Sequence, residues 1–171
     1  MNPYTLRPVE PRDIDTLWEA LTWAATMEGD RDEAARRARA DPFLSTYVAA
    51  WGRAGDDGLI AEDHDGAPAG AVWVRLNAPG EHHPLHVSTA AIPELAIAVF
   101  PGHRGEGLGE RLMQAQIARA RAARRPALAL SVRASNPATR LYARLGFVVV
   151  SEVINRVGGV SWTMRLDLTP P

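Results

Sequence analysis

The stretch that decides the fold is ELAIAVFPGHRGEGLG, residues 94–109. It contains an uninterrupted apolar run, Leu95 to Phe100, which is typical of a strand buried on both faces. A glycine-rich segment follows at once, and the pattern from about Leu108 to Arg125 then predicts an amphipathic helix. Glycines at such a junction let the backbone approach a ligand, and the free N–H groups of a helix start favour an anion. The stretch therefore predicts a phosphate or pyrophosphate site.

Two known glycine-rich motifs do not account for this loop. After Gly105 and Gly107, the third glycine of a dinucleotide fingerprint would fall at position 110, which is Glu110. A phosphate-loop motif needs a lysine, and all 19 basic residues of the chain are arginine. Taken alone, the loop has an alternative interpretation: a tight turn that needs glycine but binds no ligand.

Composition narrows the class of protein further. With 171 residues, of which 46% are hydrophobic, we expect one domain over residues 1–171. A net charge of −1 gives no indication of a nucleic-acid or membrane partner. The absence of cysteine and lysine excludes disulfides, thiolate metal sites and Schiff-base chemistry. Charges and prolines in the first twenty residues and the lack of a long apolar run predict a cytoplasmic protein.

The remaining elements are predicted from periodicity and turn signals. Before the decisive stretch we expect a strand at 4–9, a helix from about 12, a solvated helix at 30–40, a short helix at 43–51, and a hairpin of 59–62 with 69–76. After it we expect a strand at 128–132, a helix from Asn136 to Gly146, and a hairpin of 147–154 with 160–168. Residues 77–91 form a loop whose three histidines are better explained as solvated than as metal ligands, so no metal site is predicted.

Two motifs together resemble the GNAT superfamily of N-acetyltransferases. Residues 97–101 and 104–109 are similar to the family's strand followed by its Arg/Gln-x-x-Gly-x-Gly/Ala loop. Residues 135–147, SNPATRLYARLGF, are similar to its Asn-x-x-Ala-x-x-Leu-Tyr-x-x-x-Gly-Phe motif. Leu6 to Pro8 followed by Asp13 is similar to the family's opening, so the resemblance covers nearly the whole chain.

The resemblance implies an α/β fold. The central sheet would be mixed, mostly antiparallel and of about seven strands, with helices on both faces. The sheet would splay between the strands that begin near Leu95 and Leu128, and acetyl-CoA would enter there. The implied activity is direct transfer of an acetyl group from acetyl-CoA to a primary amine of a small molecule or peptide. A non-catalytic acyl-CoA sensor of the same fold is the alternative, and an unrelated nucleotide-binding domain is a third hypothesis. Self-association into a homodimer is left open.

The resemblance also assigns residues to the cofactor. Backbone groups of the apolar strand would meet the pantetheine arm, the loop and helix start would hold the pyrophosphate, Asn136 would lie beside the pantetheine, and Tyr142 would lie near the thioester sulfur. The expected cofactor residues are Ile97, Ala98, Val99, Arg104, Gly105, Gly107, Leu108, Gly109, Glu110, Asn136 and Tyr142. Structural alternatives remain, because asparagine is a good N-cap and tyrosine a common core aromatic.

Catalysis needs an acid for the departing thiolate and a base for the amine. Tyr142 is the candidate acid and Glu94 the candidate base, with a structural ion pair as the alternative for Glu94. His103 and Glu28 are lesser candidates. Without a cysteine nucleophile or a Ser-His-Asp spacing, we expect both substrates to bind at once. In the family the acceptor pocket comes from the first two helices and the last hairpin, here about 18–41 and 153–162, where no motif identifies the amine.

Overall fold

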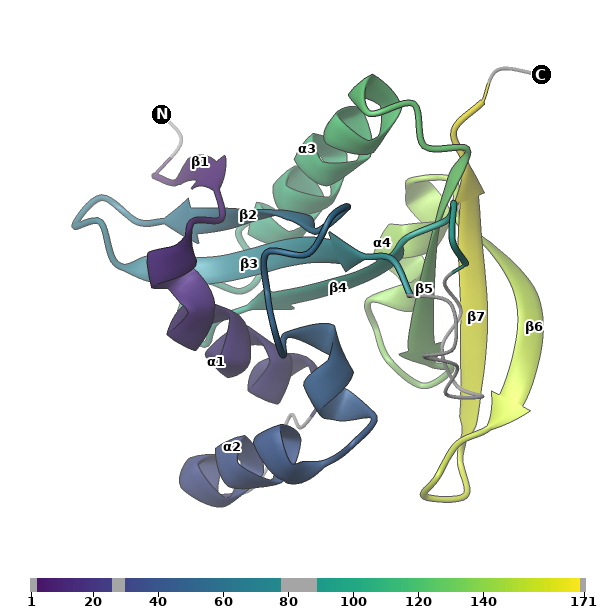
Figure 1. Cartoon of the computed structure of the whole chain (residues 1–171), viewed down its shortest axis with the longest axis horizontal. Helices are drawn as coiled ribbons and strands as arrows, with labels where there is room; N and C mark the ends of the chain where they lie inside the picture. The colour runs from purple at the N-terminus through teal and green to yellow at the C-terminus, as the bar shows by residue number, and fades with distance from the viewer. Residues whose placement is uncertain (1–2, 26–29, 78–88, 170–171) are drawn as a thin grey trace. The chain divides into compact units, whose positions relative to one another are not determined.

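The computed structural model describes residues 3–25, 30–77 and 89–169, which fall into two compact units. The first unit comprises residues 1–74 with 96–116, and the second comprises 75–95 with 117–171. Seven strands form a mixed sheet of order β1-β2-β3-β4-β5-β7-β6 (Figure 1). The predicted α/β fold is confirmed, whereas the expected single domain over 1–171 stays a prediction.

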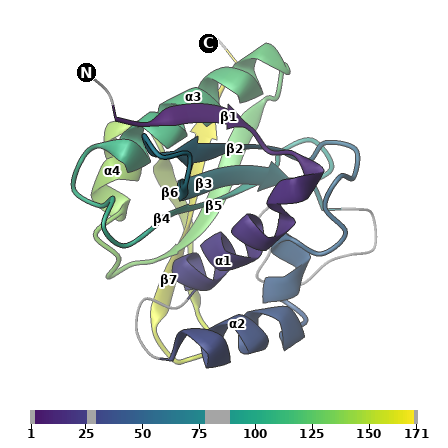
Figure 2. The ribbon, with the colours of Figure 1, turned by 90° about the vertical axis from the view of Figure 1, so that its left-hand side faces the viewer.

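The first unit is built around an antiparallel meander. Its elements are β1 (Thr5–Pro8), the 3₁₀ turn η1 (Pro11–Asp13), α1 (Ile14–Ala25), α2 (Arg31–Ala40), the 3₁₀ turn η2 (Leu44–Tyr47), β2 (Asp57–Glu62) and β3 (Pro68–Arg75). Ile60 of β2 pairs with Ala71 of β3, and both pack with Leu17 and Leu21 of α1 in one buried cluster. Helix α1 therefore covers one face of these strands, and α2 packs against α1 on its far side (Figure 2).

Gly70 explains how closely the next elements approach β3. A Cβ atom at this position would lie 2.6 Å from the carbonyl oxygen of Ala98 and 3.5 Å from Leu112. Ala98 belongs to β4 (Glu94–Val99) and Leu112 to α3 (Leu108–Ala122); the distance to Leu112 is an ordinary contact, but only glycine admits the backbone of β4 so close. The predicted inner stripe of α3 is buried, namely Leu112, Met113, Gln116, Ile117 and Ala120.

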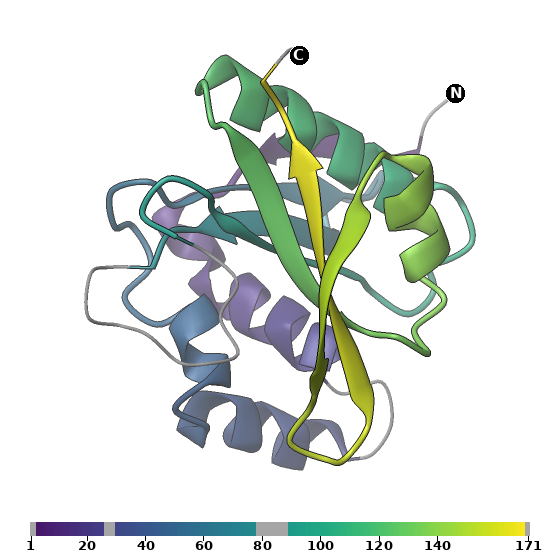
Figure 3. The same ribbon diagram turned by 90° about the vertical axis from the view of Figure 1, so that its right-hand side faces the viewer.

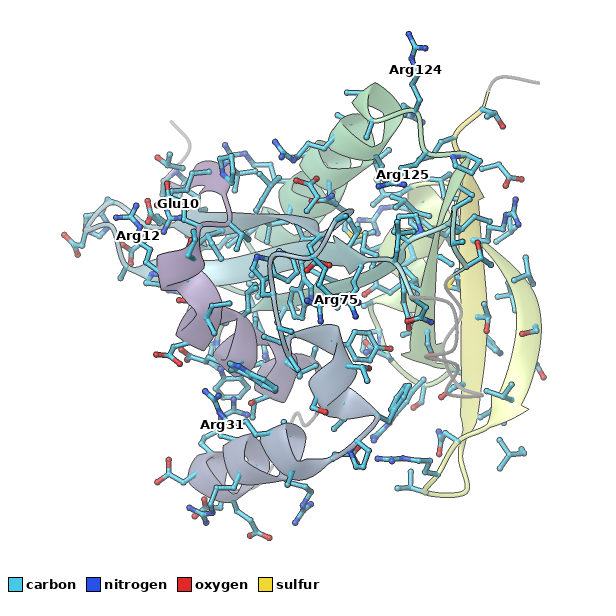
Figure 4. The ribbon with its side chains drawn as sticks, in the orientation of Figure 1. Glu10, Arg12, Arg31, Arg75, Arg124 and Arg125 are labelled. Carbon is cyan, nitrogen blue, oxygen red and sulfur yellow. The ribbon has the colours of Figure 1, made fainter. Side chains whose placement is uncertain are left out.

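A charged network ties β1 to the start of α1. The guanidinium of Arg7 donates to both carboxylate oxygens of Asp13, at 2.7 and 2.8 Å, and its Nε donates to Glu62 at 2.7 Å. These hydrogen bonds hold the pKa of the Asp13 carboxyl below its ordinary value. Nearby, Glu10 and Arg12 form an exposed ion pair (Figure 4).

The second unit is a three-stranded ribbon with a short helix. Its elements are β5 (Ala127–Arg133), α4 (Thr139–Arg144), β6 (Val148–Ile154) and β7 (Val160–Asp167), with β7 paired antiparallel to both β5 and β6 (Figure 3). Strand β5 also pairs with β4, in parallel, and Glu94 of β4 lies opposite Ala129 of β5. The expected parting of these two strands beyond that pair stays a prediction.

Three local predictions about helices are wrong in detail, and two of them concern the first unit. The helix expected over 43–51 is only the turn η2, because the backbone leaves helical geometry at Val48, where φ is −130°, and reaches a left-handed conformation at Ala50. The helix over 30–40 is solvated on one side only, since Ala34 and Ala38 are buried. The third concerns Asn136 and is taken up with the site.

Among the helices of residues 3–25, 30–77 and 89–169, none is long and apolar enough to cross a membrane.

Candidate active site

The glycine loop of the first unit leaves its backbone open on one side. Gly102, Gly105 and Gly107 have φ angles of 89°, 80° and 79°, a region that favours glycine. A Cβ atom at any of the three would meet no protein atom within 4 Å. Contact with the rest of the chain therefore does not explain these glycines; their positive φ angles do, and the open side leaves the backbone accessible.

The start of α3 adds backbone donors to this loop. Arg111 donates its N–H to Gly107 at 3.1 Å, which is the first hydrogen bond of the helix. The N–H groups of Leu108 and Gly109 precede that bond and so have no carbonyl partner within the helix, and the positive end of the helix dipole lies there. These N–H groups are the donors on which the prediction of an anion site depends, and the site itself stays a prediction.

Arg104 lies at the junction between β4 and this loop. Its Nε donates to the carbonyl of Val99 at 2.9 Å, and in the part of the chain that the structure describes it makes no ion pair. Ala98 is buried, but Ile97 and Val99 keep partial exposure, so the strand is not buried on both faces as predicted. The end of β4 therefore offers both accessible backbone and a charged side chain.

Hydrogen bonds from Tyr4, near the N-terminus, anchor the glycine loop, and the sequence analysis missed this anchor. Tyr4 donates its hydroxyl proton to Glu106 at 2.6 Å, and the same oxygen lies 3.2 Å from Nδ1 of His103. The hydrogen bond to Glu106 raises the pKa of Tyr4 to about 12. Arg111 completes the anchor by donating to the Tyr4 carbonyl at 2.9 Å. Sequence offers no signal for it, because about a hundred residues separate the partners.

Tyr142 lies on α4 in the second unit. The residue is 7% exposed and packs against Phe147, with 6.1 Å between the ring centroids. Burial raises the pKa of its hydroxyl to about 12, so the group stays protonated at neutral pH. Within residues 89–169 and the other described segments, this hydroxyl makes no hydrogen bond. Its hydroxyl is therefore a protonated donor without an acceptor among the described residues, and the role expected for it at the sulfur stays a prediction.

Asn136 is not the N-cap of α4, because the helix begins three residues later and Ala138 occupies the cap position. Its Oδ1 accepts the N–H of Ala138 at 2.9 Å, which makes a turn before the helix. The side-chain amide nitrogen has no acceptor among the described residues. The prediction of an N-cap is wrong, but a fixed amide with a spare donor remains compatible with a pantetheine contact.

Glu94, the candidate base, opens β4 and is 4% exposed. A carboxylate so deeply buried is almost always engaged by neighbours, so this geometry accommodates both the catalytic and the structural interpretation. The same unit has a hollow of about 420 Å³ beside the last hairpin. Its lining residues are Arg133, Ala134, Ser135, Asn155, Val157, Gly159 and Val160.

Other candidates contribute less. Asp63, His64 and Asp65 place possible metal-ligand atoms within 4.8 Å of one another, but Asp63 already accepts the N–H groups of Asp65 and Ala67 in the β2–β3 turn. The turn geometry accounts for this group. His103 belongs to the loop anchor. Glu28 and the three histidines of the 77–91 loop lie outside the described residues.

Comparison with known proteins decides the family. The model of the acetyltransferase (GNAT) family matches residues 16–147, which include both motifs. The chain belongs to the acetyltransferase (GNAT) family. As a GNAT protein it is an acetyl-CoA-dependent N-acetyltransferase, and the unrelated nucleotide-binding domain is excluded. Among curated protein sequences none matches this chain.

Solved GNAT structures share the fold at low sequence identity. A yncA protein of Salmonella typhimurium, a putative acetyltransferase solved with acetyl-CoA, is 22% identical with a TM-score of 0.68 and covers 98% of this chain and 95% of its own. A chimera of the spermidine N-acetyltransferase SpeG from Vibrio cholerae and hSSAT is 20% identical with a TM-score of 0.68, over 98% and 96%. A GNAT acetyltransferase from Streptococcus pneumoniae is 20% identical with a TM-score of 0.68, over 97% and 99%.

Proposed function

We propose that this GNAT enzyme transfers the acetyl group of acetyl-CoA directly to a primary amine of a small molecule or peptide. The observation that carries the proposal is the open glycine loop, which leads into the donor-rich start of α3. In this proposal the pyrophosphate binds to that loop and to Arg104, and backbone groups of Ile97, Ala98 and Val99 meet the pantetheine. The yncA protein was solved with acetyl-CoA as its cofactor, which supports the choice of donor.

Tyr142 acts in this proposal by hydrogen bonding to the departing sulfur. A thiol in water has a pKa of about 8.5, well below the value of about 12 for Tyr142. Complete proton transfer from Tyr142 to the thiolate is therefore uphill. A hydrogen bond that strengthens as negative charge develops on sulfur stabilises the transition state without that cost.

Glu94 collects the amine proton in this proposal, directly or through water. An alkylamine has a pKa of about 10.4 and is almost entirely protonated near neutral pH, so a base must act before the nitrogen can attack. Glu94 begins β4, the strand that carries Ile97 to Val99, and it is buried. Asn136 supplies its spare side-chain N–H to the pantetheine.

A screen of amines tests the activity, because the acceptor is the least defined part of the proposal. The hollow beside the last hairpin lies in one of the segments expected to form the acceptor pocket, which supports that location. The panel would include amino acids, N-terminal peptides, aminoglycosides and polyamines, the last because spermidine is named for the Vibrio cholerae protein. Release of free thiol that depends on the amine is the expected result; acetyl-CoA binding without turnover of any amine would favour the sensor.

Steady-state kinetics tests whether both substrates bind before the acetyl group is transferred. With both substrates bound at once, rates measured at varied acetyl-CoA and amine should give intersecting double-reciprocal lines. Enzyme incubated with acetyl-CoA alone should gain no acetyl mass, since the chain has no cysteine to acylate. Parallel lines with a stable acetylated protein would show covalent transfer through another side chain and would contradict the direct mechanism.

The homodimer also remains a proposal, and strand β6 supports it. All seven residues of this edge strand are exposed, including Ile154 at 70%, and five of them are valine or isoleucine. Antiparallel pairing of two copies centred on Ser151 would oppose Val149 to Val153 and Val148 to Ile154. The single carboxylate of the strand would then face a valine instead of its own copy. The cytoplasmic location stays a prediction of the sequence.

Light scattering during gel filtration measures the mass of the particle and so tests this dimer. Val149→Glu in β6 should convert a dimer to a monomer, because it places like charges along the paired edges. Val157→Glu in the following turn is the matched control, since Val157 is exposed but lies outside the strand. A monomeric wild-type protein would contradict the proposal.

A further inference from the structure

The hollow of about 420 Å³ in the second unit has one charged residue in its lining, Arg133 at the end of β5. The other lining residues come from the start of the following loop and from the hairpin between β6 and β7, and none of them is acidic. The volume lies within the range of small-molecule pockets, roughly 300–1,000 Å³. The hollow therefore combines room for a small group with a single positive charge.

Strand pairing brings three polar residues together at this end of the ribbon. Arg133 of β5 lies opposite Ser161 of β7, and directly opposite residues of antiparallel strands project from the same face of the sheet. The hydroxyl oxygen of Ser161 accepts a hydrogen bond from Nδ2 of Asn155 at 3.2 Å. Arg133 is thus the neighbour of a residue that contacts Asn155, and both Arg133 and Asn155 line the hollow.

The side chain of Asn155 is held by the hairpin turn, so the wall that it forms is fixed. Its Oδ1 accepts the N–H groups of Val157 and Gly159, at 3.1 and 3.0 Å. Its amide nitrogen donates one hydrogen to Ser161, and the second has no acceptor among the described residues. Ser135, in the same lining, has a hydroxyl without a hydrogen bond in that part of the chain. The polar side chains of the hollow therefore offer donors to a ligand.

Among the described residues, no carboxylate pairs with Arg133. Glu152 lies opposite Trp162 and accepts a hydrogen bond from its indole nitrogen at 2.9 Å. Because successive residues of a strand alternate between faces, this pair projects from the face opposite to Arg133. Asp167, the carboxylate near the end of the chain, pairs with Arg165 at 2.7 Å. The exposed guanidinium of Arg133 thus keeps its donors for a ligand.

Spacing along β5 sets how far this charge lies from the proposed base. Ala129 lies opposite Glu94, and Arg133 is four residues further along the same strand. At about 3.3 Å per residue, the two positions are roughly 13 Å apart. The amine and carboxylate of an α-amino acid lie within one residue, about 3.5 Å, whereas an extended di- or tripeptide spans about 7–11 Å. A short peptide fits this spacing once the arginine side chain covers the remainder.

We infer that the acceptor is an amine whose carboxylate lies several bonds away, as in a di- or tripeptide, and that Arg133 binds this carboxylate. The inference rests on the proposed function, because it takes Glu94 as the end of the site where the amine reacts. The amine nitrogen bonds to the acetyl carbon as the C–S bond breaks. Of the two protons that the ammonium group loses, one passes to Glu94 and one ends on the sulfur of coenzyme A. A guanidinium donates two parallel hydrogen bonds to a carboxylate and so orients the peptide.

Matched acceptors test the charge without any change to the protein. Triglycine and its C-terminal amide differ only in the carboxylate, so wild type should show a kcat/KM about 5- to 30-fold higher for the acid, the effect of one charge-assisted contact. Added salt should narrow this preference. Glycine and its amide should differ less, because the carboxylate of glycine does not extend to Arg133. Spermidine, which has no carboxylate and carries like charge, should be a poor acceptor.

Variants then assign the preference to one residue. Arg133→Gln should remove it by raising the KM of triglycine about 5- to 30-fold with kcat unchanged, since ground state and transition state share the contact. Arg133→Lys, which keeps the charge but not the planar fork, should retain part of the preference. Arg165→Gln is the matched control, because this arginine is on the same ribbon but is paired with Asp167. Thermal melting checks that each variant is folded.

The outcomes separate the inference from the proposed function. Equal use of triglycine and its amide by wild type, or an equal loss with both in Arg133→Gln, would overturn the inference alone. Weaker binding of acetyl-CoA to Arg133→Gln in calorimetry would assign Arg133 to the cofactor and would also overturn it. If wild type acetylates no amine, the proposed function fails and the inference fails with it.

Discussion

The glycine loop of the first unit is held by hydrogen bonds from distant segments, whereas Tyr142 of the second unit is held by apolar packing. Tyr4 bonds to the loop at Glu106 and His103, and Arg104 is tied to β4. The Tyr142 hydroxyl has no such bond among the described residues, and burial sets its acidity. Polar anchors fix where a ligand binds, while burial fixes the protonation state of a donor.

This difference predicts that variants of the two regions should change different quantities, namely the affinity for acetyl-CoA and kcat. Changes around the loop remove contacts that ground state and transition state share, so they should alter the affinity for acetyl-CoA with less effect on kcat. Changes at Tyr142 or Glu94 remove groups that act as charge develops, so they should alter kcat with little effect on affinity. The following predictions test that division, from the largest expected effect to the smallest.

Tyr142→Phe should lower kcat by roughly 10- to 1,000-fold, the range for loss of a proton or hydrogen-bond donor. The variant keeps the ring and its packing on Phe147, so acetyl-CoA binding by calorimetry should be nearly normal. Because the pKa is about 12, the basic limb of the wild-type pH profile at moderately alkaline pH should belong to another group. Full kcat in Tyr142→Phe, with chemistry rate-limiting, would make Tyr142 a packing residue.

Glu94→Gln should lower kcat by roughly 10- to 100-fold on amines of high pKa and much less on amines that are already neutral, since only the former need a base. The measurement is kcat/KM across amines of graded pKa at one pH. Glutamine keeps the size of the side chain, which limits damage to the buried site. Equal activity of the variant on all amines would mean that the proton leaves by another route.

Gly107→Val should weaken acetyl-CoA binding by about tenfold or more and remove most of the cofactor-induced rise in Tm. The added side chain strains a φ of 79° and fills the open space where the ligand would approach. Gly102→Val is the matched control, because it carries a similar strain at 89° but lies outside the motif. Similar losses of affinity in both variants would point to loop strain instead of a blocked site.

Tyr4→Phe should weaken acetyl-CoA binding by about two- to tenfold with kcat nearly unchanged, because it removes the hydroxyl contacts that hold the loop. Glu106→Gln, which keeps an acceptor for the hydroxyl, should weaken binding less. A fall in kcat without a change in affinity would show that the anchor does more than position the loop.

Asp13→Asn should have the smallest effect on catalysis and a visible effect on stability. The folded-state pKa of Asp13 is lowered by Arg7, so its contribution is complete above the ordinary value of about 3.9 and is lost as the pH falls through the lower folded value. The Tm of Asp13→Asn should therefore lie below that of wild type by several degrees near neutral pH, and the difference should shrink as the medium becomes strongly acidic. A difference independent of pH would mean that the ion pair does not contribute through its charge.

Local patterns in the sequence were sufficient to predict most of the helices and strands. The apolar run, the glycine loop and the stripe of α3 were predicted because each depends on neighbours in the chain or on helical periodicity. The helix expected over 43–51 was wrong because the backbone leaves helical geometry at Val48 and is left-handed at Ala50. The N-cap expected at Asn136 was wrong because its side chain closes a turn before the helix.

By itself, the sequence determined the fold class and the family and predicted an anion site in the glycine loop, because short motifs with fixed spacing carry this information. Tertiary structure alone decided that Tyr4 anchors this loop, that Arg133 and Asn155 line one hollow, and that burial raises the pKa of Tyr142. Each of these depends on contacts between residues far apart in the chain or on exclusion of water. Both the long-range contacts and the exclusion of water arise only when the chain folds, so no local sequence pattern predicts them.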